Sequence, residues 1–122
     1  MISAIHQIAV NVKDVERARA FYRDSLGLRH LFDGGPKLAF FECGGVRLML
    51  GTPERPEFDH PASLLYFRVE DIRASHGQMK ARGVRFVDEP HIVAKLPDRE
   101  VWVTAFEDGE GNTLALMSEP KT

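Results

Sequence analysis

Two stretches of this sequence follow one pattern, and this repeat restricts the fold more than any other feature. The first is QIAVNVKDVERARAFYRDSLGL at residues 7–28, and the second is LLYFRVEDIRASHGQMKARGV at residues 64–84. In each, an apolar run leads to an aspartate (Asp14 or Asp71) suited to a helix N-cap, and a glycine closes the helical segment. A repeat of this length predicts one structural unit used twice.

Short apolar runs separated by turn residues follow each copy and predict three further strands per half. These strands are expected at residues 28–32, 38–43, 46–50, 84–87, 101–106 and 113–118. The stretch Thr52–Ala62 contains three prolines, which cannot donate to a sheet ladder, so it is predicted to connect the halves. The prediction is a single α+β domain over residues 1–122, with one β-α-β-β-β module at about 4–51, the connection at about 52–62 and a second module at about 63–119.

One helix per module can cover only one face of its sheet. The eight strands would then leave their other faces uncovered, and two sheets joined edge to edge would form a cupped mixed sheet with the helices outside. Strand alternation predicts which side chains line the inside of this cup. They are Gln7, Ala9, Asn11, Arg47, Met49, Leu64, Tyr66, Arg68, Thr113 and Ala115. Because about half of them are apolar, we expect a cavity that binds a small molecule.

The overall composition excludes several classes of partner. A formal net charge of −2, with Lys and Arg scattered along the chain, gives no basic patch for nucleic acid or an anionic membrane. No apolar run approaches the length of a membrane span, and no signal peptide is visible at the start. The single cysteine, Cys43, cannot form an internal disulfide. These features predict a cytoplasmic protein.

Several residues are candidates for binding the ligand. Arg47 and Arg68 could clamp an acidic group, although pairing with a nearby acid or exposure to solvent explains each equally well. Tyr66 and Trp102 could stack on a planar ligand, and Trp102 is as easily explained by the core or a subunit interface. We therefore expect a small planar or aromatic molecule that carries an acid.

A catalytic residue is harder to identify. The segment 89–100 is long for a hairpin connection, and its His91 is the one histidine that we expect near the cavity. A general acid/base role for His91 is a hypothesis, and its alternative is a histidine that orients the ligand by hydrogen bonding. The other histidines show no spacing that specifies a metal site: His6, His30, His60 and His76.

The paired modules, the phrase NVKDVERARAFYRDSLGL, its echo YFRVEDI and the terminal hairpin FEDGEGNTLALM resemble the vicinal oxygen chelate superfamily. This superfamily includes glyoxalase I, bleomycin and fosfomycin resistance proteins, and extradiol dioxygenases. The resemblance covers nearly the whole chain. It implies a cupped sheet that, in the enzymes, holds one divalent metal.

The resemblance also implies where that metal would bind. The ligand positions fall on Gln7, Leu64, Met49 and Ala115, and of these only Gln7 can offer an oxygen to a divalent ion. One neutral amide oxygen does not make a metal site. We therefore expect no metal and no other cofactor.

Together these features favour a small-molecule-binding protein, comparable to bleomycin resistance proteins that sequester a compound without transforming it. The alternative is a glyoxalase-like lyase or dioxygenase-like enzyme with a rearranged or metal-free site, and a purely structural dimerising module is a third possibility. The resemblance also implies a homodimer, because related proteins commonly pair to complete their cavities. The sequence does not decide whether the cavity lies within one chain or between two.

Overall fold

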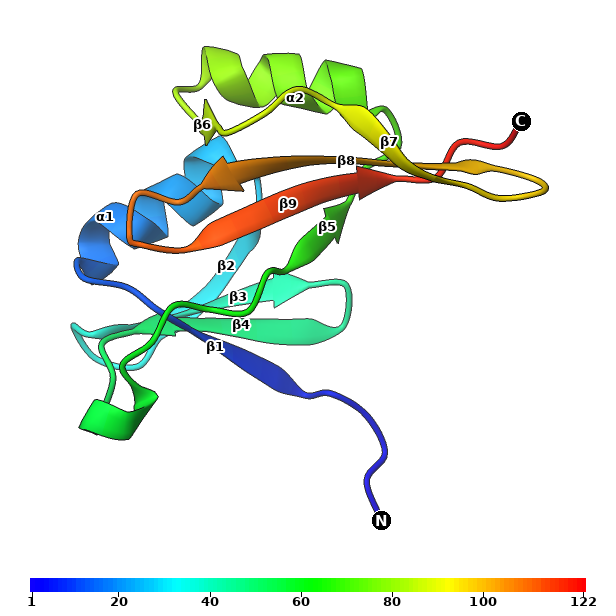
Figure 1. Ribbon diagram of the computed structural model, residues 1–122. Coiled ribbons are helices and arrows are strands. Elements are labelled where there is room, and N and C mark those ends of the chain that lie inside the picture. Colours follow the sequence, from blue (N-terminus) through cyan, green and yellow to red (C-terminus); the bar gives the residue numbers. More distant parts are fainter. The chain divides into compact units, whose positions relative to one another are not determined.

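The computed structural model describes residues 1–122 and contains two compact units. The first unit comprises residues 1–62 and 109–112, and the second comprises residues 63–108 and 113–122. Each unit combines a mixed sheet with one α-helix, which confirms the α+β class (Figure 1).

The sheet of the first unit has the strand order β1-β4-β3-β2. Strand β1 is parallel to β4, and the other neighbours are antiparallel. The helix α1 continues into a π-helical turn, η1, before β2. The elements are β1 (Gln7–Asn11), α1 (Val15–Ala20), η1 (Phe21–Ser25), β2 (Arg29–Asp33), β3 (Leu38–Cys43) and β4 (Val46–Gly51).

Local sequence explains why α1 begins and ends where it does. The Asp14 carboxylate accepts a hydrogen bond of 3.0 Å from the Arg17 amide, which satisfies a first-turn N–H that would otherwise lack a partner. After η1 the chain reverses at Gly27, whose φ of 76° favours glycine. The apolar face of the helix and the sheet beneath it form the core of this unit, with buried Val10, Val15, Ala18, Tyr22, Phe41, Leu48 and Leu50.

The sheet of the second unit has the strand order β5-β9-β8-β6, with β7 also paired to β8. Its helix is capped by Asp71, which accepts from the Ala74 amide at 3.1 Å, as Asp14 does in the first unit. Phe86 packs against His76 of the helix on one side and against Phe106 on the other. The elements are β5 (Tyr66–Arg68), α2 (Ile72–Ala81), β6 (Arg85–Phe86), β7 (His91–Lys95), β8 (Glu100–Glu107) and β9 (Thr113–Ser118).

The segment expected as a long loop at residues 89–100 contains a strand. Strand β7 pairs antiparallel with β8, with His91 opposite Val103 and Lys95 opposite Glu100. Exposed and half-buried side chains alternate along it, as in a strand with one solvated face. The protein therefore has nine strands, and the fifth predicted strand is shorter than expected, since only Tyr66–Arg68 forms β5.

The connection between the modules contains one turn of 3-10 helix, η2 (Pro56–Phe58), and no strand. Proline at its start explains the break from the sheet, because proline has no N–H to donate. Among all helices of the structure, none is long and apolar enough to cross a membrane.

Candidate functional site

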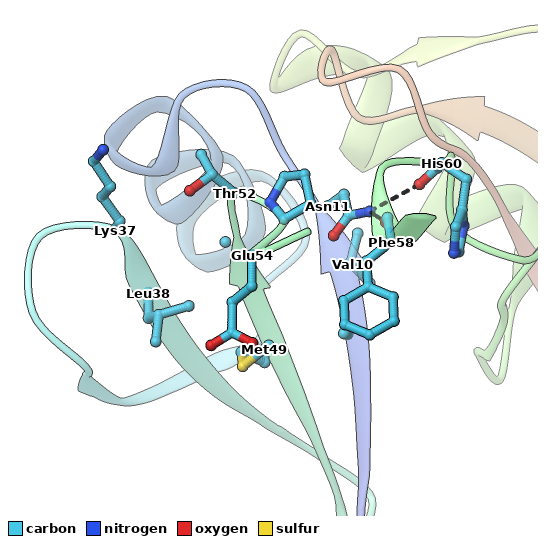
Figure 2. Close-up of a pocket in the computed structure, with 12 residues that line it drawn as sticks. Val10, Asn11, Lys37, Leu38, Met49, Thr52, Glu54, Phe58 and His60 are labelled. Carbon is cyan, nitrogen blue, oxygen red and sulfur yellow. Dashed lines mark hydrogen bonds between the residues drawn. The ribbon is translucent and has the colours of Figure 1, made fainter. Parts of the chain in front are cut away.

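A pocket of about 610 Å³ lies on the first sheet. Val10, Leu48 and Leu50 are buried on the face that α1 covers. Ala9 and Met49, which are partners in the β1–β4 register, alternate with them and point to the opposite face, where they line the pocket. The pocket is lined by Ala9, Val10, Asn11, Lys37, Leu38, Met49, Gly51, Thr52, Pro53, Glu54, Phe58 and His60 (Figure 2).

Asn11 holds the connection segment beside this pocket. Its side-chain amide donates to the carbonyl oxygens of Phe58 and, at 3.0 Å, of His60 (Figure 2). Asn112 supports Asn11 in turn, donating to the Asn11 carbonyl at 2.8 Å and accepting from the Ala62 amide at 2.7 Å. The hydrogen bonds to Phe58, His60 and Ala62 therefore hold the second half of the connection next to the sheet.

The lining of the pocket combines an apolar body with few charges. Leu38, Met49 and Phe58 supply the apolar surface, and Phe58 remains 47% exposed. Of the charged groups, Glu54 extends toward the side where Met49 and Phe58 lie, whereas Lys37 extends away from them (Figure 2). Such a surface suits an organic molecule with a substantial apolar part.

The turn between β8 and β9, residues 109–112, belongs to the first unit and is anchored by Glu110. This carboxylate accepts from the backbone amides of Lys13 (2.8 Å) and Asp14 (3.0 Å), and from Arg17 Nε at 2.5 Å. Burial alone would raise the pKa of Glu110, but the bonds from Arg17, Asp14 and Lys13 outweigh it and lower that pKa. Glu110 therefore fixes the end of β1, next to the pocket.

Gln7, Arg47 and Met49 form a second group on the same sheet. The Arg47 Nε donates to Gln7 Oε1 at 2.8 Å, and the Gln7 amide nitrogen lies 3.6 Å from the Met49 sulfur. The Arg47 guanidinium also stands over the rings of Phe40 and Phe32, at 5.1 Å and 5.8 Å from their centroids. These contacts already occupy Arg47, so it is less available to an acidic ligand than the sequence suggested.

The residues at the predicted metal positions do not fit a divalent ion. Gln7 offers its oxygen to a guanidinium, whose positive charge would repel a metal placed there. Met49 has a soft thioether, and Leu64 and Ala115 have hydrocarbon side chains. Nowhere in the chain do three or more His, Cys, Asp or Glu side chains gather in a way that could hold a metal ion.

In the second unit, the strand register separates the predicted site residues between two faces of the sheet. Tyr66 is opposite Ala115 and Arg68 is opposite Met117, which places these side chains on one face. His91 shares that face through Val103, the partner of Met117. Tyr66 is 51% exposed, and Leu64, just before β5, is also exposed. This face therefore presents apolar surface together with one arginine.

Trp102 lies on the other face of this sheet. It pairs with Ser118 and alternates with Val103, so it shares the face of Phe106 beneath α2. Its ring lies 5.1 Å from the Arg73 guanidinium of that helix. Trp102 and Tyr66 therefore cannot form two walls around one planar ligand.

His91 is exposed, and its Nδ1 lies 2.7 Å from the Glu89 carbonyl oxygen. This contact with the Glu89 carbonyl therefore orients the His91 side chain. The connection supplies Glu54, Phe58 and His60 to the pocket, a contribution that was not predicted from the sequence. One feature of the sequence could have indicated this contribution: the connection is polar and rich in proline, yet it contains an aromatic residue, Phe58.

Comparison with known proteins identifies the family. Residues 4–116 match the model of the Glyoxalase/Bleomycin resistance protein/Dioxygenase superfamily. The chain belongs to this superfamily, as the resemblance of its motifs indicated.

Solved structures agree with this assignment. A superfamily member from Sphaerobacter thermophilus DSM 20745 is 26% identical with a TM-score of 0.77, and covers 97% of this chain and 98% of its own. TnmS3, described as an antibiotic binding protein from Streptomyces sp. CB03234, is 27% identical with a TM-score of 0.76, at 98% coverage of both chains. A lactoylglutathione lyase from Agrobacterium tumefaciens shares the fold at 22% identity, with a TM-score of 0.71 and coverage of 96% and 94%.

Proposed function

We propose that this protein binds a small organic molecule in the pocket of its first unit and does so without a metal. The observation that carries the proposal is the pocket of about 610 Å³, whose lining combines Leu38, Met49 and Phe58 with a few polar groups. This volume and this balance of apolar and polar groups are typical of ligand sites.

The arrangement of the connection supports binding. Asn11 bonds to the carbonyls of Phe58 and His60, so the side chains that border the pocket are positioned before any ligand arrives. Preorganisation of this kind lowers the entropy that binding costs. The antibiotic-binding protein TnmS3, which is 27% identical over nearly the whole chain, supports the same class of function.

The absence of suitable metal ligands favours binding over the metal-dependent reactions of the superfamily. Gln7 is engaged by Arg47, and Leu64, Met49 and Ala115 provide no oxygen or nitrogen donor. The alternative, a lyase or dioxygenase-like enzyme with a rearranged site, would need donors from elsewhere in the chain.

For the ligand itself we retain the class expected from the sequence, an aromatic molecule with an acidic group. Lys37 is the one lysine or arginine that lines the pocket and could attract such a group, because Arg68 belongs to the second unit and does not line the pocket, and Arg47 is already engaged by Gln7. A homodimer in the cytoplasm completes the proposal, and both of these features remain predictions from the sequence and the resemblance.

A thermal-shift screen of aromatic acids, their neutral amides and aliphatic acids tests the proposal. A ligand at about 100 times its dissociation constant adds roughly 2.7 kcal/mol of stability, which raises the Tm of a domain of this size by several degrees. Phe58→Ala should abolish most of the shift, because it removes the aromatic wall of the pocket. Phe32→Ala is the matched control, since Phe32 is 48% exposed on the same sheet and does not line the pocket.

Two outcomes would contradict the proposal. Equal loss of the shift in both phenylalanine variants would mean that the pocket is not the site. An unchanged preference for acid over amide in Lys37→Met would show that Lys37 does not recognise the acid. Lys80→Met, at an exposed lysine of α2, serves as the control for that substitution.

A further inference from the structure

A second hollow, of about 360 Å³, lies in the second unit where α2 begins. It is separate from the pocket proposed above, because every residue that lines it belongs to residues 63–108 or 113–122. The polar and aromatic groups that line it are Glu70, Asp71, Arg73, Glu100, Trp102 and Ser118.

The indole of Trp102 is the flat surface of this hollow. The Arg73 guanidinium stands over the ring at 5.1 Å from its centroid, so this face accommodates a planar cation. The indole Nε1 donates to Glu100 Oε1 at 3.2 Å, which holds a carboxylate at the edge of the ring. An aromatic face with an adjacent carboxylate is a suitable arrangement for a guanidinium.

The charges of the hollow are not balanced internally. Glu70, Asp71 and Glu100 contribute three carboxylates, and Arg73 contributes the one guanidinium. None of these four side chains forms an ion pair within 4 Å, and Asp71 uses its carboxylate to cap α2. The remaining negative charge attracts a cation and repels an anion.

Ser118 adds a buried polar group. It lies opposite Trp102 in the β8–β9 ladder, is 2% exposed and lines the hollow. No protein group forms a hydrogen bond with its hydroxyl. A serine hydroxyl can accept a hydrogen bond, so Ser118 provides an acceptor for a ligand N–H in this hollow.

We propose that this hollow binds the guanidinium group of a small molecule, and that Arg73 occupies the site when no ligand is bound. The ligand's guanidinium replaces that of Arg73 on the Trp102 ring and donates to Glu100 and Ser118. Arg73, which is on the exposed first turn of α2, then turns toward solvent. We propose a guanidinium rather than an ammonium group because a planar cation can stack on the flat Trp102 ring and also donate to the two acceptors beside it, Glu100 and Ser118.

Fluorescence titration measures this binding directly, because Trp102 is the only tryptophan in the chain. The probe is butylguanidinium, and the matched neutral compound is butylurea, which has nearly the same shape without the charge. We expect a saturable change in Trp102 emission with butylguanidinium and none with butylurea. A change that does not saturate, or that butylurea reproduces, would overturn the proposal.

Three variants distinguish displacement of Arg73 from general attraction to a negative surface. Arg73→Gln should bind butylguanidinium about two- to fivefold more tightly, because the competing internal cation–π contact is lost. Glu100→Gln should bind at least about tenfold more weakly, as expected for loss of a charge-assisted hydrogen bond. Arg82→Gln, an exposed arginine at the other end of α2, should not alter binding beyond a small screening effect.

The gain of affinity in Arg73→Gln cannot arise from misfolding, so it keeps the test decisive even if Glu100→Gln is unstable. If Arg73→Gln binds no more tightly than Arg82→Gln, Arg73 does not occupy the site and the proposal is wrong.

Discussion

Arg47 Nε donates a hydrogen bond of 2.8 Å to Gln7 Oε1, joining two residues that face each other in the β1–β4 register. In a metal-dependent member of the fold, the position of Gln7 would provide a ligand. Here its one oxygen donor serves a guanidinium, and the nearby Met49 sulfur accepts from its amide at 3.6 Å. The hydrogen bond between Gln7 and Arg47 therefore joins β1 to β4 at the position that provides a metal ligand in metal-dependent members of the fold.

The first prediction is that the protein contains only substoichiometric divalent metal. The physical reason is the repulsion between Arg47 and any cation at Gln7, together with the missing donors at Leu64, Met49 and Ala115. Elemental analysis of protein purified without a chelator measures it. About one metal ion per chain, lost together with an activity on chelation, would favour the enzyme.

The second prediction concerns acid stability and Glu110. Its pKa is lowered in the folded state by Arg17 and two backbone amides despite burial, so it stabilises the fold above the ordinary carboxyl pKa. That contribution is lost as the pH falls through the lowered value. Urea unfolding should show that Glu110→Gln costs about 2 kcal/mol at pH 7 and distinctly less at pH 3.

Glu16→Gln, an exposed change on α1, is the control for this experiment and should cost little at either pH. An equal cost of Glu110→Gln at both pH values would show that the charge of Glu110 does not contribute to stability.

The third prediction is that Asn11→Ala loosens the connection beside the pocket. The substitution removes the hydrogen bonds to the carbonyls of Phe58 and His60, each worth about 1 kcal/mol. Hydrogen exchange at the amides of Phe58, Asp59 and His60 should accelerate about fivefold or more. Thr52→Ala, also in the pocket lining, should leave exchange unchanged.

The fourth prediction is a homodimer. Tyr66 is exposed on one face of the second sheet, and Leu64, just before β5, is exposed as well, so a partner would cover this apolar surface. Light scattering on a sizing column should give about twice the monomer mass of 13.8 kDa. A monomer at every concentration would contradict this and leave that apolar face open to solvent.

The repeat predicted the fold class because its signals are local. Asp14 and Asp71 cap the two helices, and Gly27 and Gly83 adopt positive φ values of 76° and 91° after them. Short-range steric and hydrogen-bonding preferences determine such features, and a single sequence displays them. Strand β7 was missed because a short run with two β-branched residues, Ile92 and Val93, between polar ends resembles a loop until β8 pairs with it.

The site was predicted only in part. Ala9, Asn11 and Met49, which strand alternation assigned to the inner face, line the pocket, since the period of a strand is independent of its surroundings. Alternation could not show that Arg47 is engaged by Gln7 and two phenylalanine rings, because those partners are distant in sequence. It also could not place Phe58, whose position depends on hydrogen bonds from Asn11.

The sequence by itself determined the fold class, the helix caps and the lack of donor side chains at Leu64, Met49 and Ala115, all of which follow from residue type and short-range spacing. Only the tertiary structure decided which polar groups remain available for a ligand. Gln7 and Arg47 engage each other across 40 positions of the chain, and Arg73 covers Trp102 from a neighbouring helix. Such pairings depend on how strands register and helices pack, which local preferences do not specify.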